Sequence, residues 1–253
     1  MNLNTLAKKV DDAALTNTPI SQISNDVSIS LEDAYEIQKL SIARRLDRGE
    51  KLLGLKMGFT SKAKMEQMGV HDMILGRLTD AMLYEAGSEL SRSKFIHPRA
   101  EPEIAFLIGK DIREEITLEN VSEYVQSVAL AVEVIDSRYE KFKFSLEDVV
   151  ADNCSSAAFA IGQWHPVETN IKGILMSMVS DDVIVGKGNS DAILGNPLAS
   201  MVAAARLANT YGEFINKGHV ILAGAATPAS YIKKGSTIAA FAEGLGSLFM
   251  DIV

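Results

Sequence analysis

Residues 97–109 read HPRAEPEIAFLIG and residues 128–138 read VALAVEVIDSR, and both segments have the apolar character of buried strands. Glu101 and Glu103 are two residues apart, so on a strand their side chains point to the same face. Glu133 lies in a segment, 128–135, whose other residues are all apolar. A carboxylate buried there is costly unless a cation pairs with it. A hard divalent cation held by the three carboxylates would remove that cost.

Two interpretations of these glutamates remain open on the pattern alone. In the first, Glu101, Glu103 and Glu133 bind Mg²⁺ or Mn²⁺, which prefer oxygen ligands and keep coordination positions open for water or substrate. In the second, the glutamates form ion pairs with nearby cationic side chains, for which Lys56, Arg99 and Arg138 are the candidates. The E-x-E pattern is too short to decide between a metal site and a set of ion pairs.

Lys56 lies in the sequence GLKMG at 54–58, between glycines and apolar neighbours, where we expect a short strand at 52–57. A lysine at such a position stabilises a developing enolate, or transfers protons if its pKa is lowered. The alternative is a lysine whose ammonium group reaches solvent. Ser155 belongs to a run of small polar residues at 152–156 that either lines a polar pocket or forms a turn.

Composition limits the classes of function. The 253 residues carry a net charge of −8, which argues against nucleic acid or an anionic membrane as the main partner. Cys154 is the only cysteine, so the chain forms no internal disulfide and no cysteine-rich zinc site. No run of about 18 apolar residues exists, and residues 1–15 do not resemble a secretory signal. We therefore expect a cytoplasmic protein that spans no membrane.

The expected elements run from helices to strands. Helical periodicity occupies 3–15 and the segment between Ser30 and Gly49, and a helix-like segment covers 61–68. From about residue 80, short strand-like segments dominate, with one helix inserted at 198–211 after the capping pair Asn196-Pro197. This order predicts an α+β fold: a helical segment at 1–50 packed on a single β-rich catalytic domain at 51–253.

Several motifs in this order resemble the 2-oxopent-4-enoate hydratase / 4-oxalocrotonate decarboxylase family of the fumarylacetoacetase-like superfamily. They are GLKMGFTSKAKMEQMGV, HPRAEPEIAFLIG, AVEVIDSRY, ADNCSSAAFAIG, LGNPLASMVAAARLAN and GLGSL, and together they cover the chain from about residue 30 onward. The resemblance implies a strongly curved, mixed β-structure, barrel-like in shape, that encloses the site, with helices packed around it.

The resemblance also implies a set of site residues. It assigns Mg²⁺ or Mn²⁺ to Glu101, Glu103 and Glu133, and the catalytic lysine to Lys56. The family's pocket aspartate corresponds to Asp80 in GRLTDAM, and its pocket serine to Ser155 in ADNCSS. Together these are the residues on which we expect the chemistry to depend.

Within the family, the sequence IDSRYEKFKFSLEDVVADN at 135–153 resembles the decarboxylase branch. The sequence AEPEIAF at 100–106 is equally familiar from hydratases, and LAGAATPA at 222–229 departs from the Gly-Gly-Ile-Thr pattern of several decarboxylases. The function that the resemblance implies is decarboxylation of 2-oxohex-3-enedioate (4-oxalocrotonate) to 2-oxopent-4-enoate in meta-cleavage catabolism of aromatic compounds, with 2-oxopent-4-enoate hydratase as the alternative. The implied partners are a 2-oxo dicarboxylate substrate, further copies of the chain in a homo-oligomer, and a sister hydratase or decarboxylase.

Overall fold

The computed structural model describes residues 2–61, 65–66, 69–70 and 72–253, and in these the chain forms two β-sheets with helices packed around them. The strands of the larger sheet are β1 Leu52–Gly58, β2 Ile74–Thr79, β3 Leu83–Glu85, β5 Arg99–Ile108, β6 Val125–Ile135, β7 Ser156–Ile161, β8 His165–Pro166, β11 Val220–Ala225 and β12 Ser230–Tyr231. Their order is β2-β1-β11-β5-β6-β7-β3, with β12 paired to β5 and β8 paired to β6.

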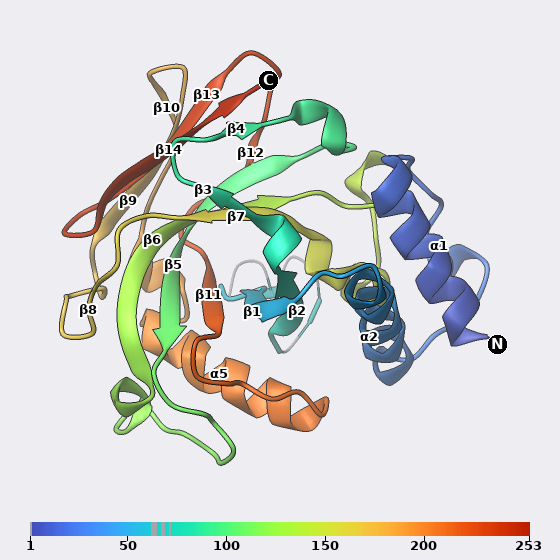
Figure 1. The fold of residues 1–253 in the computed structure, drawn as a ribbon, viewed down its shortest axis with the longest axis horizontal. Helices are drawn as coiled ribbons and strands as arrows, with labels where there is room; N and C mark the ends of the chain where they lie inside the picture. The colour runs from blue at the N-terminus through green and yellow to red at the C-terminus, as the bar shows by residue number, and fades with distance from the viewer. Residues whose placement is uncertain (1, 62–64, 67–68, 71) are drawn as a thin grey trace.

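The smaller sheet has the order β10-β9-β13-β14-β4. Its strands are β4 Glu89–Leu90, β9 Leu175–Ser180, β10 Val183–Asn189, β13 Thr237–Ala242 and β14 Gly246–Ile252. Figure 1 shows the larger sheet curling strongly along the length of β5 and β6, with the smaller sheet packed at one end. Parallel pairs, such as β1 with β11, occur beside antiparallel ones, so the sheet is mixed. The predicted α+β class with a curved mixed sheet is confirmed.

The helices begin where the sequence supplies caps. They are α1 Leu3–Thr16, α2 Leu31–Asp47, α4 Leu146–Ala151 and α5 Pro197–Thr210. Ser30 and Asp33 form a capping box at the start of α2, and the Asn196 side chain accepts the Leu198 N–H at the start of α5. The predicted inserted helix is therefore present as α5, but α4 is an additional short helix that the sequence analysis missed. Most of the helix expected at 61–68 lies outside the described residues.

Helix α2 packs directly on the β-structure that carries the site. The buried Gln38 amide donates to the carbonyl oxygens of Leu75 at 3.1 Å and Val150 at 2.7 Å, and its own oxygen accepts from Arg77. Ile37 belongs to the same hydrophobic cluster as residues of β5 and β6. Helix α2 thus packs on the core, while the division of the chain into a helical segment at 1–50 and a catalytic domain at 51–253 stays a prediction.

Strands β5 and β6 pair in antiparallel register, which places Glu101 directly opposite Glu133. Pro102 lies between the two glutamates of β5 and has no N–H, and its carbonyl accepts the Ala226 N–H at 3.0 Å. The N–H and C=O groups of a strand residue point to the same neighbouring strand, so the N–H that Pro102 lacks would have faced the β11 side. Nearby, the β5–β11 register shifts by one residue between Leu222, which pairs with Ala105, and Ala225, which pairs with Glu103, and this forms a β-bulge opposite Ile104.

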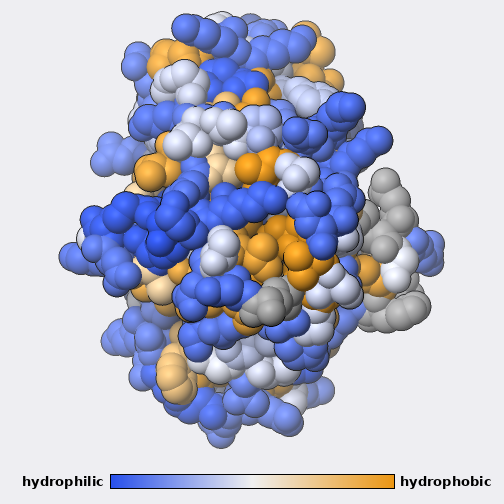
Figure 2. All heavy atoms as spheres, turned by 90° about the vertical axis from the view of Figure 1, so that its right-hand side faces the viewer, coloured by the Kyte–Doolittle hydropathy of each residue, from blue (hydrophilic) through white to orange (hydrophobic). Residues whose placement is uncertain are grey.

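The face on the side of α1 and α2 is mostly hydrophilic, and apolar side chains gather in a patch near its centre (Figure 2). Among the described residues, the helices are all too short or too polar to cross a bilayer.

Candidate metal centre and active-site cavity

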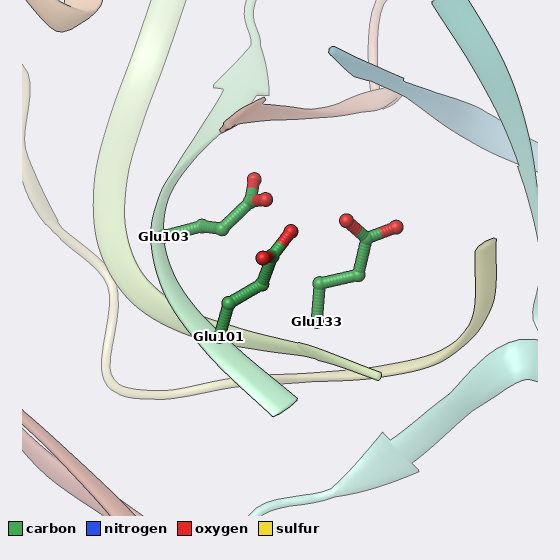
Figure 3. A group of neighbouring side chains, drawn as sticks. All are labelled: Glu101, Glu103 and Glu133. Atoms are coloured by element: carbon green, nitrogen blue, oxygen red, sulfur yellow. The ribbon is translucent and has the colours of Figure 1, made fainter. Parts of the chain in front are cut away.

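The three predicted glutamates meet between β5 and β6, and their side chains point toward a common space (Figure 3). Each can offer one carboxylate oxygen such that these oxygens all lie within 4.8 Å of one another. All are buried, with exposures of 4% for Glu101 and 0% for Glu103 and Glu133. Like charges placed this close in a low-dielectric interior repel one another strongly, so the cluster needs a compensating cation.

Two of these carboxylates retain unused oxygens. Glu103 Oε2 accepts the Gly224 N–H at 2.7 Å, and Glu133 Oε2 lies 2.8 Å from Lys56 Nζ. The Oε1 atoms of Glu103 and Glu133 are buried and have no hydrogen-bond partner within the part of the chain that the structure describes. Burial, followed by repulsion from Glu133, holds the pKa of Glu103 well above its usual range, and burial also raises the pKa of Glu133. Buried oxygens of this kind are the donor set that Mg²⁺ and Mn²⁺ prefer, so the residues fit such an ion.

Gly224 can donate to Glu103 because of the bulge in β11. Its φ is +105°, and a Cβ there would lie 2.1 Å from Thr60 Oγ1. Glycine is therefore required for both the backbone angle and the close approach of Thr60. The bulge in β11 thus supplies a backbone donor that holds one side of the glutamate cluster in place.

Lys56 lies in the middle of β1, paired with Leu222 on one side and Gly76 on the other. A Cβ at Gly76 would lie 3.1 Å from the Lys56 side chain, so the glycine leaves room for it. The lysine is 3% exposed, which rules out an ammonium group that reaches solvent. Burial alone would lower its pKa, but Glu133, Glu103 and Glu101 raise the pKa above the usual lysine value. The glutamates thus favour the protonated form of Lys56 in the metal-free protein, whereas a proton-transfer role was expected to need a lowered pKa.

The turn before β7 brings backbone and side-chain groups to the same place. Asn153, Cys154 and Ser155 have positive φ angles of 49°, 52° and 58°, which is costly for residues other than glycine. The turn is held because the Asn153 side chain bonds both backbone groups of Arg77, at 2.7 and 2.8 Å. It places the Cys154 carbonyl 3.4 Å from Lys56 Nζ. Ser155 is buried, lines the cavity described below, and its Oγ has no partner among the described residues.

A buried ion pair fixes the start of this turn. The Asp152 carboxylate accepts the Arg138 backbone N–H at 2.9 Å and binds the Arg138 guanidinium, whose Nη2 also donates to the Asp152 carbonyl. Burial raises the pKa of Asp152 to about 6 even though Arg138 opposes the shift. Arg138 is thus engaged with Asp152, and it does not pair with the glutamate cluster in the structure.

We expect Asp152→Ala to destabilise the protein by about 3–5 kcal/mol, because it leaves the Arg138 charge buried without its partner. Urea unfolding followed by circular dichroism measures the change. The double variant Asp152→Ala/Arg138→Met should recover much of the loss, since it removes the orphaned charge. Asp26→Ala, which removes an exposed acid, is the control, and its free energy of unfolding should change by no more than about 0.5 kcal/mol. A loss of stability below about 1 kcal/mol in Asp152→Ala would show that the ion pair with Arg138 does not hold the turn in place.

Asp80 does not join the site. It lies just after β2, is exposed, and accepts the Lys51 backbone N–H at 2.8 Å. It is four residues beyond Gly76, the neighbour of Lys56, which corresponds to about 13 Å along an extended strand. It is absent from the described lining of the cavity. Its side chain ties the end of β2 to the residue before β1, and the pocket role expected for Asp80 stays a prediction.

A cavity of about 670 Å³ opens beside the glutamates and has the size of a small-molecule site. Glu101, Lys56 and Ser155 contribute to its wall. Its lining also includes residues that the sequence analysis did not assign to the site, namely Thr60, Arg99, Phe142, Lys143 and Phe144. The last three form the F-K-F sequence that resembles the decarboxylase branch, so a signal for them was present in the sequence.

Comparison with known proteins places these observations in a family. The family model for the fumarylacetoacetate (FAA) hydrolase C-terminal region matches residues 61–253. The chain is 46% identical to a 4-oxalocrotonate decarboxylase from Pseudomonas sp. over 98% of its own length and 97% of that protein. It is 35% identical to a 2-hydroxyhexa-2,4-dienoate hydratase from Comamonas testosteroni, over 93% of this chain and 90% of the relative.

A solved structure supports the same placement. The 4-oxalocrotonate decarboxylase from Pseudomonas putida G7, complexed with magnesium and adipate, superposes with a TM-score of 0.96 at 36% identity. The match covers 99% of this chain and 97% of that one. The resemblance first inferred from short motifs therefore extends over the whole fold, and the chain belongs to the fumarylacetoacetate hydrolase family.

Proposed function

We propose that the chain is a metal-dependent lyase that decarboxylates 2-oxohex-3-enedioate to 2-oxopent-4-enoate. The observation that carries the proposal is the buried cluster of Glu101, Glu103 and Glu133, in which Glu103 and Glu133 each keep an oxygen without a partner among the described residues. The cluster lies beside the buried Lys56 at the wall of a cavity. Support comes from the relatives, since the protein at 46% identity is a 4-oxalocrotonate decarboxylase. The solved relative binds magnesium together with adipate, which is a six-carbon dicarboxylate.

In this proposal, Glu101, Glu103 and Glu133 hold Mg²⁺ or Mn²⁺. The bound ion supplies Lewis acidity to the 2-oxo acid end of the substrate. Lys56 stabilises the negative charge that develops on the C2 oxygen through its ammonium group, which is buried beside the cluster. Ser155 contributes a hydroxyl group to the cavity wall that is available to a substrate oxygen.

The reaction balances with these groups. The C5–C6 bond breaks and C6 leaves as CO₂. The electron pair of that bond forms the C4–C5 double bond, the C3–C4 pair shifts to C2–C3, and the charge reaches the C2 oxygen. Protonation at C3 gives 2-oxopent-4-enoate, and protonation at the oxygen gives its dienol. The residues described here therefore have to stabilise one developing negative charge at the C2 oxygen and to exclude water from it.

Hydration of 2-hydroxypenta-2,4-dienoate remains the second candidate, because the relative at 35% identity is a hydratase of a closely similar dienoate. The same cluster and lysine would serve that reaction, since both chemistries pass through a conjugated enol. The higher identity to the decarboxylase favours the first candidate.

The deciding experiment supplies purified protein and Mg²⁺ with 2-oxohex-3-enedioate, and follows the loss of ultraviolet absorbance together with CO₂ release. Metal-dependent release of CO₂ is the expected result, and it should disappear with chelator. Turnover of 2-hydroxypenta-2,4-dienoate without any CO₂ from the dicarboxylate would establish the hydratase instead. Absence of both activities would refute the lyase proposal.

Magnesium affinity should rise with pH. Burial raises the pKa of Glu103 and Glu133, so at lower pH the cation must displace protons from the carboxyl groups. We expect affinity to increase as pH rises above the ordinary titration range of a glutamate, approaching tenfold per pH unit for each proton released. Calorimetry in buffers of different ionisation enthalpy measures the affinity and the protons together. An affinity independent of pH, with no proton release, would contradict ligation by these groups.

We also propose that the protein is cytoplasmic and forms a homo-oligomer that associates with a sister hydratase. The buried free thiol of Cys154 suits a reducing compartment. The dienol form of the product is unstable, so a short transfer to the next enzyme would limit its loss. Light scattering with and without the hydratase tests both associations.

A further inference from the structure

Arg99 continues the line of side chains that forms the metal centre. It is two residues before Glu101 on β5, just as Glu101 is two residues before Glu103, so all three side chains lie on one face of the strand. Arg99 and Glu101 both line the cavity. The spacing puts the Arg99 backbone about 7 Å beyond that of Glu101. One wall of the cavity thus carries carboxylates at one end and a guanidinium at the other.

Two aromatic rings hold the Arg99 guanidinium. Its central carbon lies 4.1 Å from the centroid of the Phe142 ring and 4.5 Å from that of the Tyr231 ring. Nη2 donates to the Tyr231 hydroxyl at 2.9 Å. The loop that presents Phe142 is strained, because Lys141 and Phe142 have positive φ angles of 60° and 57°. This arrangement fixes the plane of the guanidinium and leaves its N–H edge as the group available for bonding.

The guanidinium has no carboxylate partner within the described part of the chain. The ion pairs described there involve other arginines, such as Arg77 with Glu213 and Arg138 with Asp152. Arg99 itself is half-buried, and its Nε is buried without a hydrogen-bond acceptor among the described residues. A guanidinium held in place without an anion is suited to a carboxylate brought by a ligand, which it can bind through two parallel N–H groups.

We infer that Arg99 binds the second carboxylate of a dicarboxylate whose 2-oxo acid end lies at the glutamate cluster. This assignment rests on the proposed function and names the group that selects a dicarboxylate over a monocarboxylate. With C–C bonds of about 1.5 Å, an extended six-carbon chain separates its two carboxyl carbons by roughly 6 Å, which matches the strand spacing between Glu101 and Arg99.

The chemistry of the second carboxylate determines how Arg99 acts. That carboxylate is the one that leaves as CO₂, and neutral CO₂ forms much weaker hydrogen bonds with a guanidinium than a carboxylate does. An arginine bound to it therefore stabilises the bound substrate at least as well as the transition state. Arg99→Gln should accordingly raise KM by about 10- to 100-fold, with a much smaller change in kcat.

The test compares two saturated analogues that share the 2-oxo acid end. 2-Oxohexanedioate has the distal carboxylate, and 2-oxohexanoate has a methyl group in its place. Calorimetric titration of the magnesium-loaded wild-type protein should show a preference of about 10- to 100-fold for the dicarboxylate. Arg99→Gln should lose that preference while binding 2-oxohexanoate as the wild type does. Arg113→Gln is the matched control, because Arg113 stacks on Phe214 at 5.0 Å but is absent from the described cavity lining.

A preference for the dicarboxylate that survives in Arg99→Gln overturns the inference, as does a wild-type protein without any preference. If Lys143→Gln abolishes the preference and Arg99→Gln does not, the exposed lysine of the cavity wall is the selecting group, and the assignment to Arg99 is wrong. These binding results do not depend on turnover. An Arg99-dependent preference without CO₂ release refutes the proposed function alone, and CO₂ release with an unchanged preference in Arg99→Gln refutes the inference alone.

Discussion

Glu103→Gln should abolish magnesium binding and lower turnover by about 10³-fold, while the fold survives. The substitution replaces a carboxylate with an amide of the same shape at the centre of the cluster. The amide oxygen can still accept the Gly224 N–H that Glu103 Oε2 accepts at 2.7 Å, so the bulge in β11 keeps its hydrogen bond. What is lost is the negative charge and the second oxygen, which has no other partner among the described residues.

The stability of this variant provides an independent check. Burial raises the pKa of Glu103 in the folded protein. In the metal-free protein this carboxyl group therefore opposes folding at any pH above its pKa in the unfolded chain. The contribution of Glu103 to the stability of the metal-free wild type therefore falls as pH rises from its pKa in the unfolded chain through its raised pKa in the folded protein. Glu103→Gln lacks this titration and should be at least as stable as the metal-free wild type at neutral pH.

Three measurements on Glu103→Gln test whether Glu103 is a metal ligand that the fold does not require: calorimetric titration with Mg²⁺, CO₂ release, and thermal unfolding in chelator. Glu123→Gln, which replaces an exposed acid, is the control and should behave as the wild type in all three measurements. Full metal-dependent turnover in Glu103→Gln would show that the cluster is not the metal centre. Loss of activity through unfolding would show instead that the carboxylate is needed for the fold.

Lys56→Met should keep magnesium binding and still slow turnover by about 10²- to 10³-fold. Lys56 Nζ lies 2.8 Å from Glu133 Oε2, so the lysine competes with a divalent cation for that carboxylate. Its removal frees the oxygen and removes a positive charge near the ion, which favours metal binding. It also removes the buried ammonium that we expect to stabilise the charge on the substrate oxygen. Methionine fits because Gly76 leaves room for an unbranched chain.

The two halves of the Lys56 prediction are measured separately, by calorimetry with Mg²⁺ and by single-turnover kinetics at saturating substrate. Lys110→Met is the control, since Lys110 is an exposed lysine whose ammonium lies 5.9 Å from the Tyr124 ring centroid. An unchanged rate in Lys56→Met would make the lysine a neutralising neighbour of Glu133 without a catalytic role. Loss of magnesium binding would mean that Lys56 organises the ligands.

The sequence predicted the elements whose signals are local. The capping residues Ser30 and Asn196 located the starts of α2 and α5, and the apolar runs around Glu103 and Glu133 located β5 and β6. Strand β2 was missed because Gly76 and Arg77 interrupt its apolar run, and helix α4 because it has only six residues. The buried role of Arg77, which bonds Gln38 and Glu213, depends on chain segments that are distant in sequence.

The candidate site was predictable to the extent that its residues were chemically out of place. Glu133 was conspicuous because it is a carboxylate in an apolar strand, but its register opposite Glu101 could not be obtained from either segment alone. Asp80 was assigned by resemblance, and its side chain instead bonds the Lys51 amide. Arg99 was noted only as a partner for the acids, because its position between Phe142 and Tyr231 requires three separate segments to fold together.

Pro102 shows how an uncharged residue shapes a charged site. Its carbonyl accepts the N–H of Ala226, the residue after β11, but it has no N–H to complete the pair. Two residues further along β5, opposite Ile104, β11 accommodates one additional residue. That additional length turns the Gly224 amide away from the sheet and toward Glu103. In the sequence E-P-E, the two acids supply the charge, and the proline between them removes one donor from the sheet next to a bulge whose backbone N–H binds one of the acids.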